Sequence, residues 1–342
     1  MNWLIKKILE FTGSQKFLSV QLDITNVCNL NCLHCYQAKH SSGADLSLQD
    51  WRRILDQYDS LTKKLCLKPH FCISGGEPTL SPIFPDILVE IHSRWPDAGI
   101  VILTNGTIIS EETSSVMIKH KVDVQISLDG PDSARHNFIR GAGKFDKALE
   151  GYRTLREAGL NITFQTVLSN RTAQWITEFF ELALKMNAGA MNFTRFVPQG
   201  KGKNFCETSG ERPLAGAELK ATYKSILAAS KKSGIPTGTN LPLFVLISPE
   251  LGAHGKFGFQ GLVVDHQGNL KVSSRADFRL GNILSAGLEQ LFLRHPLMEA
   301  LRTGRIETCG SCDFYDRCGG DRTAAFAAYD SFTKKDPGCW IS

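Results

Sequence analysis

Short apolar runs and amphipathic stretches alternate along the first two-thirds of this 342-residue chain. Such alternation predicts parallel strands, because parallel neighbours need a long crossover that usually contains a helix. The apolar runs that we predict as strands are residues 18–24, 70–74, 100–103, 122–127, 161–167 and 191–196. The amphipathic stretches that we predict as helices are residues 47–58, 84–94, 111–119, 145–158, 175–186 and 218–233.

Six strand–helix units are too few to close an eight-stranded barrel. We therefore predict an α/β fold, an open partial (β/α)6 barrel over residues 18–235, with a small cysteine-rich domain over residues 236–342. Gly, Pro, Thr and Asn cluster at residues 234–242, which predicts a loop, and residues 261–272 have the pattern of a β-hairpin. In such a sheet, ligands bind at the carboxyl ends of the strands.

Composition excludes several classes of protein. The hydrophobic fraction of 42% and charged fraction of 21% are typical of a soluble globular chain, and a net charge of +5 is too mild for a nucleic-acid binder. The sequence contains no run of 18 apolar residues, so it predicts no transmembrane segment. Ten cysteines without a secretory signal favour metal or cluster binding in a reducing compartment, so we predict a cytoplasmic protein.

Residues 1–17 form a separate amphipathic segment that contains Lys6 and Lys7. It lacks the long apolar core and the small-residue cleavage site of a signal peptide. Two interpretations remain open, docking to a membrane surface and packing on the rim of the barrel. The short length of the segment favours packing on the rim.

Three cysteines, Cys28, Cys32 and Cys35, directly follow the first predicted strand with the spacing CxxxCxxC. A four-iron cluster takes four thiolate ligands, so three from one loop leave one iron open to an outside ligand. The alternatives are a zinc knuckle and three incidental thiols, but zinc sites usually add a second pair of ligands at a suitable distance. The next metal-binding side chains lie more than 30 residues away along an apolar run, at Cys66, His70 and Cys72.

Residues 23–36, DITNVCNLNCLHCY, resemble the signature loop of the radical S-adenosylmethionine (SAM) superfamily. In that family the three cysteines hold a four-iron, four-sulfur cluster, and the amino and carboxylate groups of SAM bind the fourth iron. One electron then cleaves SAM to a 5′-deoxyadenosyl radical, which takes a hydrogen atom from the substrate. The resemblance implies a radical SAM enzyme, with His34 in the place of an aromatic residue that is usual there, and an electron donor such as flavodoxin or ferredoxin.

The run Ser74-Gly75-Gly76-Glu77-Pro78 ends the second predicted strand. The two glycines permit a close backbone approach and unusual φ values, and the proline fixes the direction in which the chain leaves. Alone, the run would predict only a turn. In the radical SAM family the matching GGEP motif holds the amino end of SAM through backbone groups and the glutamate.

Further strand ends carry polar residues. The fourth strand ends in SLDG, and the resemblance implies that Ser127 and Arg140 bind the carboxylate of SAM. Asn105 lies in a TNG turn that resembles the family's turn near the ribose and adenine, although a plain turn explains the pattern equally well. Thr166 and Arg195 end the fifth and sixth strands, and we predict that they face the same cavity.

A second set of four cysteines lies near the C-terminus, at Cys309, Cys312, Cys318 and Cys339. Four thiolates can complete a cluster without outside help, and structural zinc is the alternative. The spacing resembles the C-terminal half of the SPASM domain of peptide-modifying radical SAM enzymes. The domain is truncated, because Ser273 and Ser274 stand where a cysteine is expected and none follows Cys318 closely. We therefore predict one auxiliary cluster, and two four-iron clusters in all.

The SPASM resemblance implies epimerisation or crosslinking of a ribosomally synthesised peptide. The alternative is modification of a tetrapyrrole side chain, because the tail also resembles that of heme decarboxylase and heme d1 biosynthesis enzymes. A non-catalytic electron-transfer scaffold is disfavoured, since it has no use for an open iron. Cys206 follows the sixth strand on a Gly/Lys-rich stretch, where it is either a hydrogen donor to a substrate radical or a rim thiol without a catalytic role.

Overall fold

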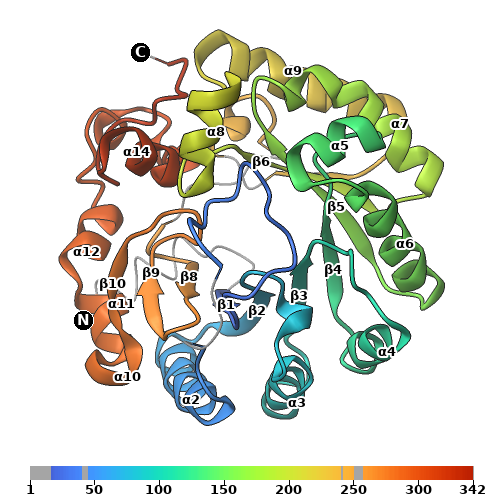
Figure 1. The fold of residues 1–342 in the computed structure, drawn as a ribbon. Helices are drawn as coiled ribbons and strands as arrows, with labels where there is room; N and C mark the ends of the chain where they lie inside the picture. Colours follow the sequence, from blue (N-terminus) through green and yellow to red (C-terminus); the bar gives the residue numbers. More distant parts are fainter. Residues whose placement is uncertain (1–16, 41–44, 240–241, 250–256, 342) are drawn as a thin grey trace.

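The computed structural model describes residues 17–40, 45–239, 242–249 and 257–341. In this part of the chain, ten strands form one sheet in the order β10-β9-β8-β1-β2-β3-β4-β5-β6-β7, with helices outside it (Figure 1). The predicted segment 1–17 lies outside the described residues apart from Phe17, which begins β1. None of the described helices is long and apolar enough to cross a membrane.

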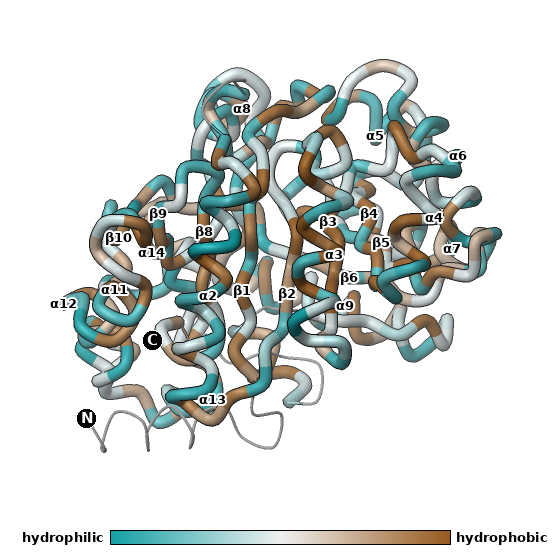
Figure 2. The backbone as a smooth tube through the Cα atoms, turned by 90° about the horizontal axis from the view of Figure 1, so that it is seen from below, coloured by the Kyte–Doolittle hydropathy of each residue, from teal (hydrophilic) through white to brown (hydrophobic). Residues whose placement is uncertain are grey.

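The predicted α/β fold with a parallel sheet is confirmed. The strands are β1 (Phe17–Asp23), β2 (Lys68–Ser74), β3 (Gly99–Thr104), β4 (Asp123–Ser127), β5 (Ile162–Leu168) and β6 (Ala190–Arg195). The helices are α2 (Leu48–Leu65), α3 (Phe84–Arg94), α4 (Glu111–Lys119), α5 (Ser133–Arg140), α6 (Lys144–Glu157), α7 (Ile176–Met186), α8 (Lys201–Ser209) and α9 (Gly216–Ser233). Sequence patterns did not predict α5 and α8, which lie at one edge of the molecule (Figure 2).

Side chains alternate between the two faces of each strand, which gives the sheet an outer and an inner face. The outer face packs against the helices: Leu18, Val20 and Leu22 of β1 are buried with Trp51 and Leu55 of α2. Residues of the opposite parity form the inner face. Its curvature is clear from Asn192 of β6, whose amide donates to Gln125 of β4 at 3.2 Å, past the intervening β5.

The C-terminal third extends the same sheet on both sides. Strand β7 (Thr237–Thr239) pairs with β6, and β8 (Gly261–Val264) pairs in parallel with β1. The predicted hairpin over residues 261–272 is confirmed by β8 and β9 (Asn269–Lys271), and the Asp265 carboxylate accepts the backbone N–H of Asn269 at 2.9 Å in its turn. Strand β10 (Arg279–Asn282) follows. The domain division at residues 235–236 stays a prediction, because the sheet is continuous across it.

Short helices complete the chain. They are α10 (Ile283–Ala286), α11 (Leu288–Arg294), α12 (Pro296–Arg302), α13 (Tyr315–Cys318) and α14 (Arg322–Tyr329). Helices α10 and α11 lie beside α2, and α14 lies near α8 in the view of Figure 1. The side chain of Gln57 in α2 accepts the N–H of Leu288 at 2.7 Å, which ties α11 to the first helix of the barrel.

Candidate active site

The first cysteine loop leaves the carboxyl end of β1, as predicted. Cys28, Cys32 and Cys35 are free thiols, with Cys32 buried and the other two half-buried. Burial raises the pKa of all three thiols, that of Cys28 to about 11, so the metal-free loop holds neutral thiols. A thiol must lose its proton to bind a metal as a thiolate, so cluster assembly here must release protons.

Each of these sulfurs has a polar group close by. The N–H of Leu30 donates to Cys28 Sγ at 3.5 Å, and Arg140 Nη1 lies 4.0 Å from Cys32 Sγ. His40, which sequence reasoning missed, has Nε2 3.7 Å from Cys35 Sγ, while its Nδ1 lies 3.1 Å from the Asn26 carbonyl. An Nδ1–H that donates to this carbonyl leaves Nε2 free to accept the Cys35 proton. The donor set fits a thiolate-bound cluster.

The glycines of the GGEP motif allow two chain segments to meet. The N–H of Gly76 donates to the Thr25 carbonyl at 2.9 Å, and that of Glu77 donates to the Val27 carbonyl at 2.8 Å. A Cβ on Gly75 would lie 2.2 Å from the Thr25 oxygen, and one on Gly76 would lie 2.2 Å from the Val27 oxygen. The close approach is thus to the backbone that enters the cysteine loop. Direct contact of this motif with SAM stays a prediction.

Glu77 links the GGEP motif to the TNG turn. Its carboxylate is fully buried, and one oxygen accepts the hydroxyls of Thr104 at 2.7 Å and Thr79 at 2.8 Å. The other oxygen accepts the N–H of Asn105 at 2.8 Å, and the Asn105 amide donates to Asn29 of the cysteine loop at 2.9 Å. Burial raises the pKa of Glu77 in spite of these hydrogen bonds. Glu77 and Asn105 therefore position the first cysteine loop. No observation tests whether they also contact SAM, so that contact stays a prediction. Pro78 begins a short 3-10 helix beside them.

Asp129, in the SLDG sequence after β4, is a residue that sequence reasoning missed. It is fully buried, and its Oδ2 accepts His34 Nε2 and Arg140 Nε, each at 2.6 Å. Its Oδ1 accepts the N–H of Val167 at 2.8 Å. Burial alone would raise the pKa of this carboxyl, but Arg140 and His34 outweigh it and hold the pKa well below its usual range. The sequence feature that could have identified Asp129 is an acidic residue directly after a buried strand.

Three residues at the ends of β4, β5 and β6 were predicted to face one cavity, and only one of them lies on the inner face of the sheet. Ser127 is half-buried on the inner face of β4, which agrees with the prediction, although its role stays untested. Thr166 shares the parity of Phe164 on the outer face of β5 and donates its hydroxyl to the Leu128 carbonyl at 2.7 Å. Arg195 shares the outer face of β6 with Phe193 and is buried. The prediction that Thr166 and Arg195 face the same cavity as Ser127 is corrected, because side-chain parity places them behind the sheet.

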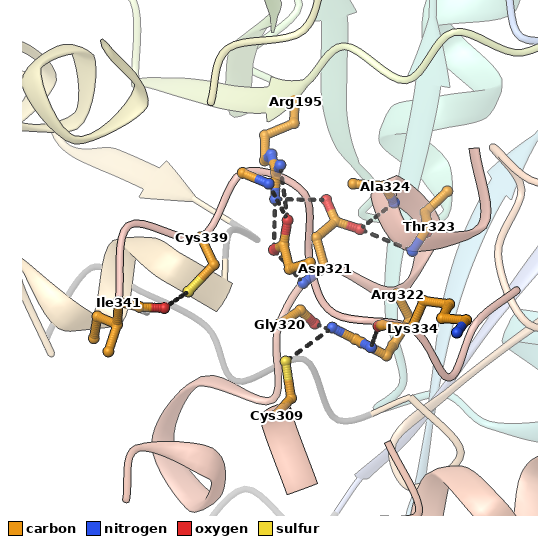
Figure 3. A network of polar contacts seen from close by, with 12 residues as sticks. Arg195, Cys309, Gly320, Asp321, Arg322, Thr323, Ala324, Lys334, Cys339 and Ile341 are labelled. Carbon is orange, nitrogen blue, oxygen red and sulfur yellow. Dashed lines mark hydrogen bonds and ion pairs between the residues drawn. The ribbon is translucent and has the colours of Figure 1, made fainter. Parts of the chain in front are cut away.

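The four C-terminal cysteines, Cys309, Cys312, Cys318 and Cys339, line one pocket that is partly open to solvent. All four are free thiols. Burial raises the pKa of Cys318 to about 12, and Arg322 Nη2 donates to Cys309 Sγ at 3.5 Å (Figure 3). Among the residues that the structure describes, no three His, Cys, Asp or Glu side chains gather to hold a single metal ion. A shared cavity with thiols on its wall fits a larger group such as a cluster.

Cys206 lies on helix α8 rather than on the loop expected from the Gly/Lys-rich stretch. The helix contacts the first cysteine loop, because the N–H of Gly202 donates to the Cys35 carbonyl at 3.2 Å. Cys206 is half-buried, and burial raises the pKa of its thiol, aided by Glu211 and Glu207. A neutral S–H is the form that can give up a hydrogen atom, but the catalytic role stays a prediction.

Comparison with known proteins identifies the barrel. The family model of the radical SAM superfamily matches residues 22–183, which include the first cysteine loop, the GGEP motif and the Asp129 site. The chain therefore contains a radical SAM domain. Enzymes of this superfamily use SAM and a four-iron, four-sulfur cluster. That Cys28, Cys32 and Cys35 are the ligands of this cluster stays a prediction.

Relatives extend the likeness to nearly the whole chain. An AdoMet-dependent heme synthase of Methanosarcina barkeri is 29% identical, with 93% of this chain and 94% of that protein covered. Mycofactocin maturase MftC of Mycobacterium tuberculosis is also 29% identical, with 93% and 81% covered. The crystal structure of Streptococcus suis SuiB bound to precursor peptide SuiA has the same fold, with a TM-score of 0.74 at 17% identity, and covers 98% of this chain and 78% of SuiB.

Proposed function

We propose that this radical SAM enzyme modifies a ribosomally synthesised peptide, by epimerisation or crosslinking, with one cluster at the N-terminal cysteine loop and an auxiliary cluster at the C-terminal cysteines. When bound, the first cluster supplies the electron that cleaves SAM to a 5′-deoxyadenosyl radical. The cysteines that would bind this cluster lie at the strand ends, where the GGEP motif, the TNG turn and Asp129 all form hydrogen bonds with the cysteine loop. A flavodoxin or ferredoxin as electron donor and a cytoplasmic location remain predictions.

The chemistry of the inner barrel face carries the peptide proposal. Strands β1, β2, β4, β5 and β6 present polar groups there, whereas β3 presents the apolar Val101 and Leu103. The polar residues are Ser19, Gln21, Asp23, His70, Cys72, Asp123, Gln125, Ser127, Thr163, Gln165, Asn192 and Thr194. Amides and hydroxyls donate and accept, as peptide backbone groups require of their partners. The only Lys or Arg on the inner face of these six strands is Lys68, at the far, amino end of β2.

Two relatives support the same substrate class. Mycofactocin maturase is a peptide-modifying enzyme of the same family, and SuiB shows this fold together with a bound precursor peptide. An inner face that is rich in amides and hydroxyls and carries Asp23 and Asp123 but no arginine suits a peptide backbone more than it suits a polyanion. The carboxylates of a tetrapyrrole are recognised best by arginine forks, which these strands do not offer on their inner face.

Tetrapyrrole modification is the second candidate. The observation that favours it is the end-to-end match to the heme synthase, which covers 94% of that protein, compared with 81% for the mycofactocin maturase. Loops at the mouth of the barrel could supply the cations that the strands lack. Substrate assays separate these two candidates.

The deciding experiment incubates the reduced enzyme with SAM in deuterated buffer, with one of two probes. One probe is a set of short peptides translated from open reading frames that flank the gene, and the other is a tetrapyrrole that carries propionate side chains. We expect deuterium at an α-carbon, or loss of two hydrogens on crosslinking, in the peptide only. Turnover of the tetrapyrrole with loss of carbon dioxide, and none of the peptide, would replace the first proposal by the second.

Iron content tests the two cluster sites. The protein purified without oxygen should hold about eight irons per chain, four for each cluster. Replacement of Cys28, Cys32 and Cys35 by alanine should leave about four irons and abolish SAM cleavage. The matched triple replacement of Cys309, Cys312 and Cys318 should leave a similar amount of iron but preserve SAM cleavage. Unchanged iron in either variant would contradict the assignment of that site.

A further inference from the structure

A buried ion pair joins the barrel to the C-terminal tail. Arg195, at the end of β6, donates through both terminal nitrogens to Asp336, at 2.8 and 3.0 Å (Figure 3). The two side chains are only 4% and 0% exposed. Such a two-pronged contact fixes orientation as well as distance, because the planar guanidinium matches the carboxylate.

This pair lies between two of the auxiliary cysteines. Asp336 is three residues before Cys339, whose N–H donates to the Asp336 carbonyl at 3.1 Å. Asp321 is three residues after Cys318, and its N–H donates to the Asp336 carboxylate at 2.8 Å. Arg195 Nη1 also lies 3.8 Å from the Asp321 carboxylate. One arginine of the barrel thus holds both chain segments that carry Cys318 and Cys339.

The backbone of the tail approaches Arg195 closely. A Cβ on Gly338 would lie 2.2 Å from Arg195 Nη2, so glycine lets the tail reach the guanidinium without displacing it. Behind it, Arg275 donates to the Arg195 carbonyl at 2.8 Å. The ring of Tyr223, whose centroid lies 6.0 Å from that of Trp340, is close enough to Arg195 for the guanidinium charge to oppose the rise in the Tyr223 pKa that burial causes. A confined site with apolar rings nearby strengthens the attraction between the paired charges.

We propose that Arg195 is a positioning residue for the auxiliary cluster, which sets the separation of Cys318 and Cys339 from the barrel side. This inference rests on the proposed cluster at the four C-terminal cysteines. It makes retention of that cluster dependent on a residue of the barrel that touches none of its ligands. The first cluster site has its own supports, at Asp129 and Glu77, and does not depend on Arg195.

The test replaces Arg195 by Gln, which keeps hydrogen-bonding groups but removes the charged fork. We expect iron to fall from about eight to about four per chain. Cys318 and Cys339 should become open to alkylation, while formation of 5′-deoxyadenosine at the first cluster continues. Arg212→Gln is the matched control, because Arg212 forms a similar two-pronged pair with Glu218 on the surface, at 2.6 and 3.0 Å. The control should keep all of its iron.

Each outcome has a distinct meaning. Wild-type protein with only about four irons, all lost on replacement of the first three cysteines, would refute the auxiliary cluster itself. Full iron in both wild type and Arg195→Gln would overturn the positioning role and leave the cluster proposal intact. If Arg195→Gln does not fold, Arg195→Lys decides, since it keeps the buried charge without the fork. Selective loss of the auxiliary cluster in that variant supports the role, and full retention or loss of both clusters overturns it.

Discussion

His136, in α5, gives a prediction whose size follows from its surroundings. The side chain is 1% exposed, and its Nδ1 accepts the N–H of Asp129 at 3.4 Å. Burial, and then the charge of Arg140, lower the pKa of His136 to about 3. The folded protein therefore keeps this imidazole neutral at pH 5 and above.

The unfolded chain behaves differently, because a free histidine has a pKa of about 6.5. Between pH 7.5 and 5 the unfolded chain takes up a proton at His136 that the folded chain does not, so stability falls as the pH falls. Integrating the difference over this range gives a loss of about 2 kcal/mol of unfolding free energy. The result hardly changes for any folded-state pKa below about 4, since the folded protein then stays unprotonated at pH 5.

Urea unfolding of the full, cluster-free chain at several pH values measures this loss. His136→Asn keeps an acceptor near Nδ1 but cannot titrate, so the stability of wild type relative to the variant should fall by about 2 kcal/mol from pH 7.5 to 5. Taking the difference cancels other groups that titrate, such as Glu77. His295→Asn is a matched control, because His295 Nδ1 also accepts a backbone N–H, at 3.2 Å, but is less buried. A difference that does not vary with pH would refute the reasoning.

Three further predictions concern single positions. Gly76→Ala should lower the unfolding free energy by about 1–3 kcal/mol and reduce the iron held at the first site. Gly261→Ala, whose Cβ would meet open space, should change neither quantity, as thermal unfolding and iron analysis of the two variants can show. Asp129→Asn leaves Arg140 buried without its counter-charge and should cost about 3–5 kcal/mol in urea unfolding, so a loss below about 1 kcal/mol would count against the ion pair. Cys206→Ala should still cleave SAM but release no inverted peptide if the thiol donates hydrogen; normal product would assign that step elsewhere.

The strand ends show what the sequence could and could not predict. Apolar runs located β1–β6, because buried strands must be apolar on the face that packs against helices. Position at a strand end was not enough to place a side chain, as Thr166 and Arg195 show. Each lies two residues after an outer-face phenylalanine, so counting parity from Phe164 and Phe193 would have placed both behind the sheet.

Other features depend on contacts between distant parts of the chain. Both cysteine sets could be located from their spacing, but their surroundings could not. His34 and Asp129 are 95 residues apart, and Arg195 and Asp336 are 141 residues apart. No local pattern pairs such residues, because only the folded sheet brings strand ends together at one edge.

The two buried carboxylates of the first site change how its motifs are interpreted. Glu77 accepts three hydrogen bonds within 2.8 Å, and Asp129 accepts three within 2.8 Å, all from groups of the protein itself. An acceptor whose oxygens are already satisfied has little left to offer a ligand. We therefore expect SAM to be recognised mainly by backbone groups and by side chains with free donors. Substitution of Glu77 or Asp129 would then reduce cluster retention before it affects SAM affinity, because these residues hold the loop that carries the cysteines.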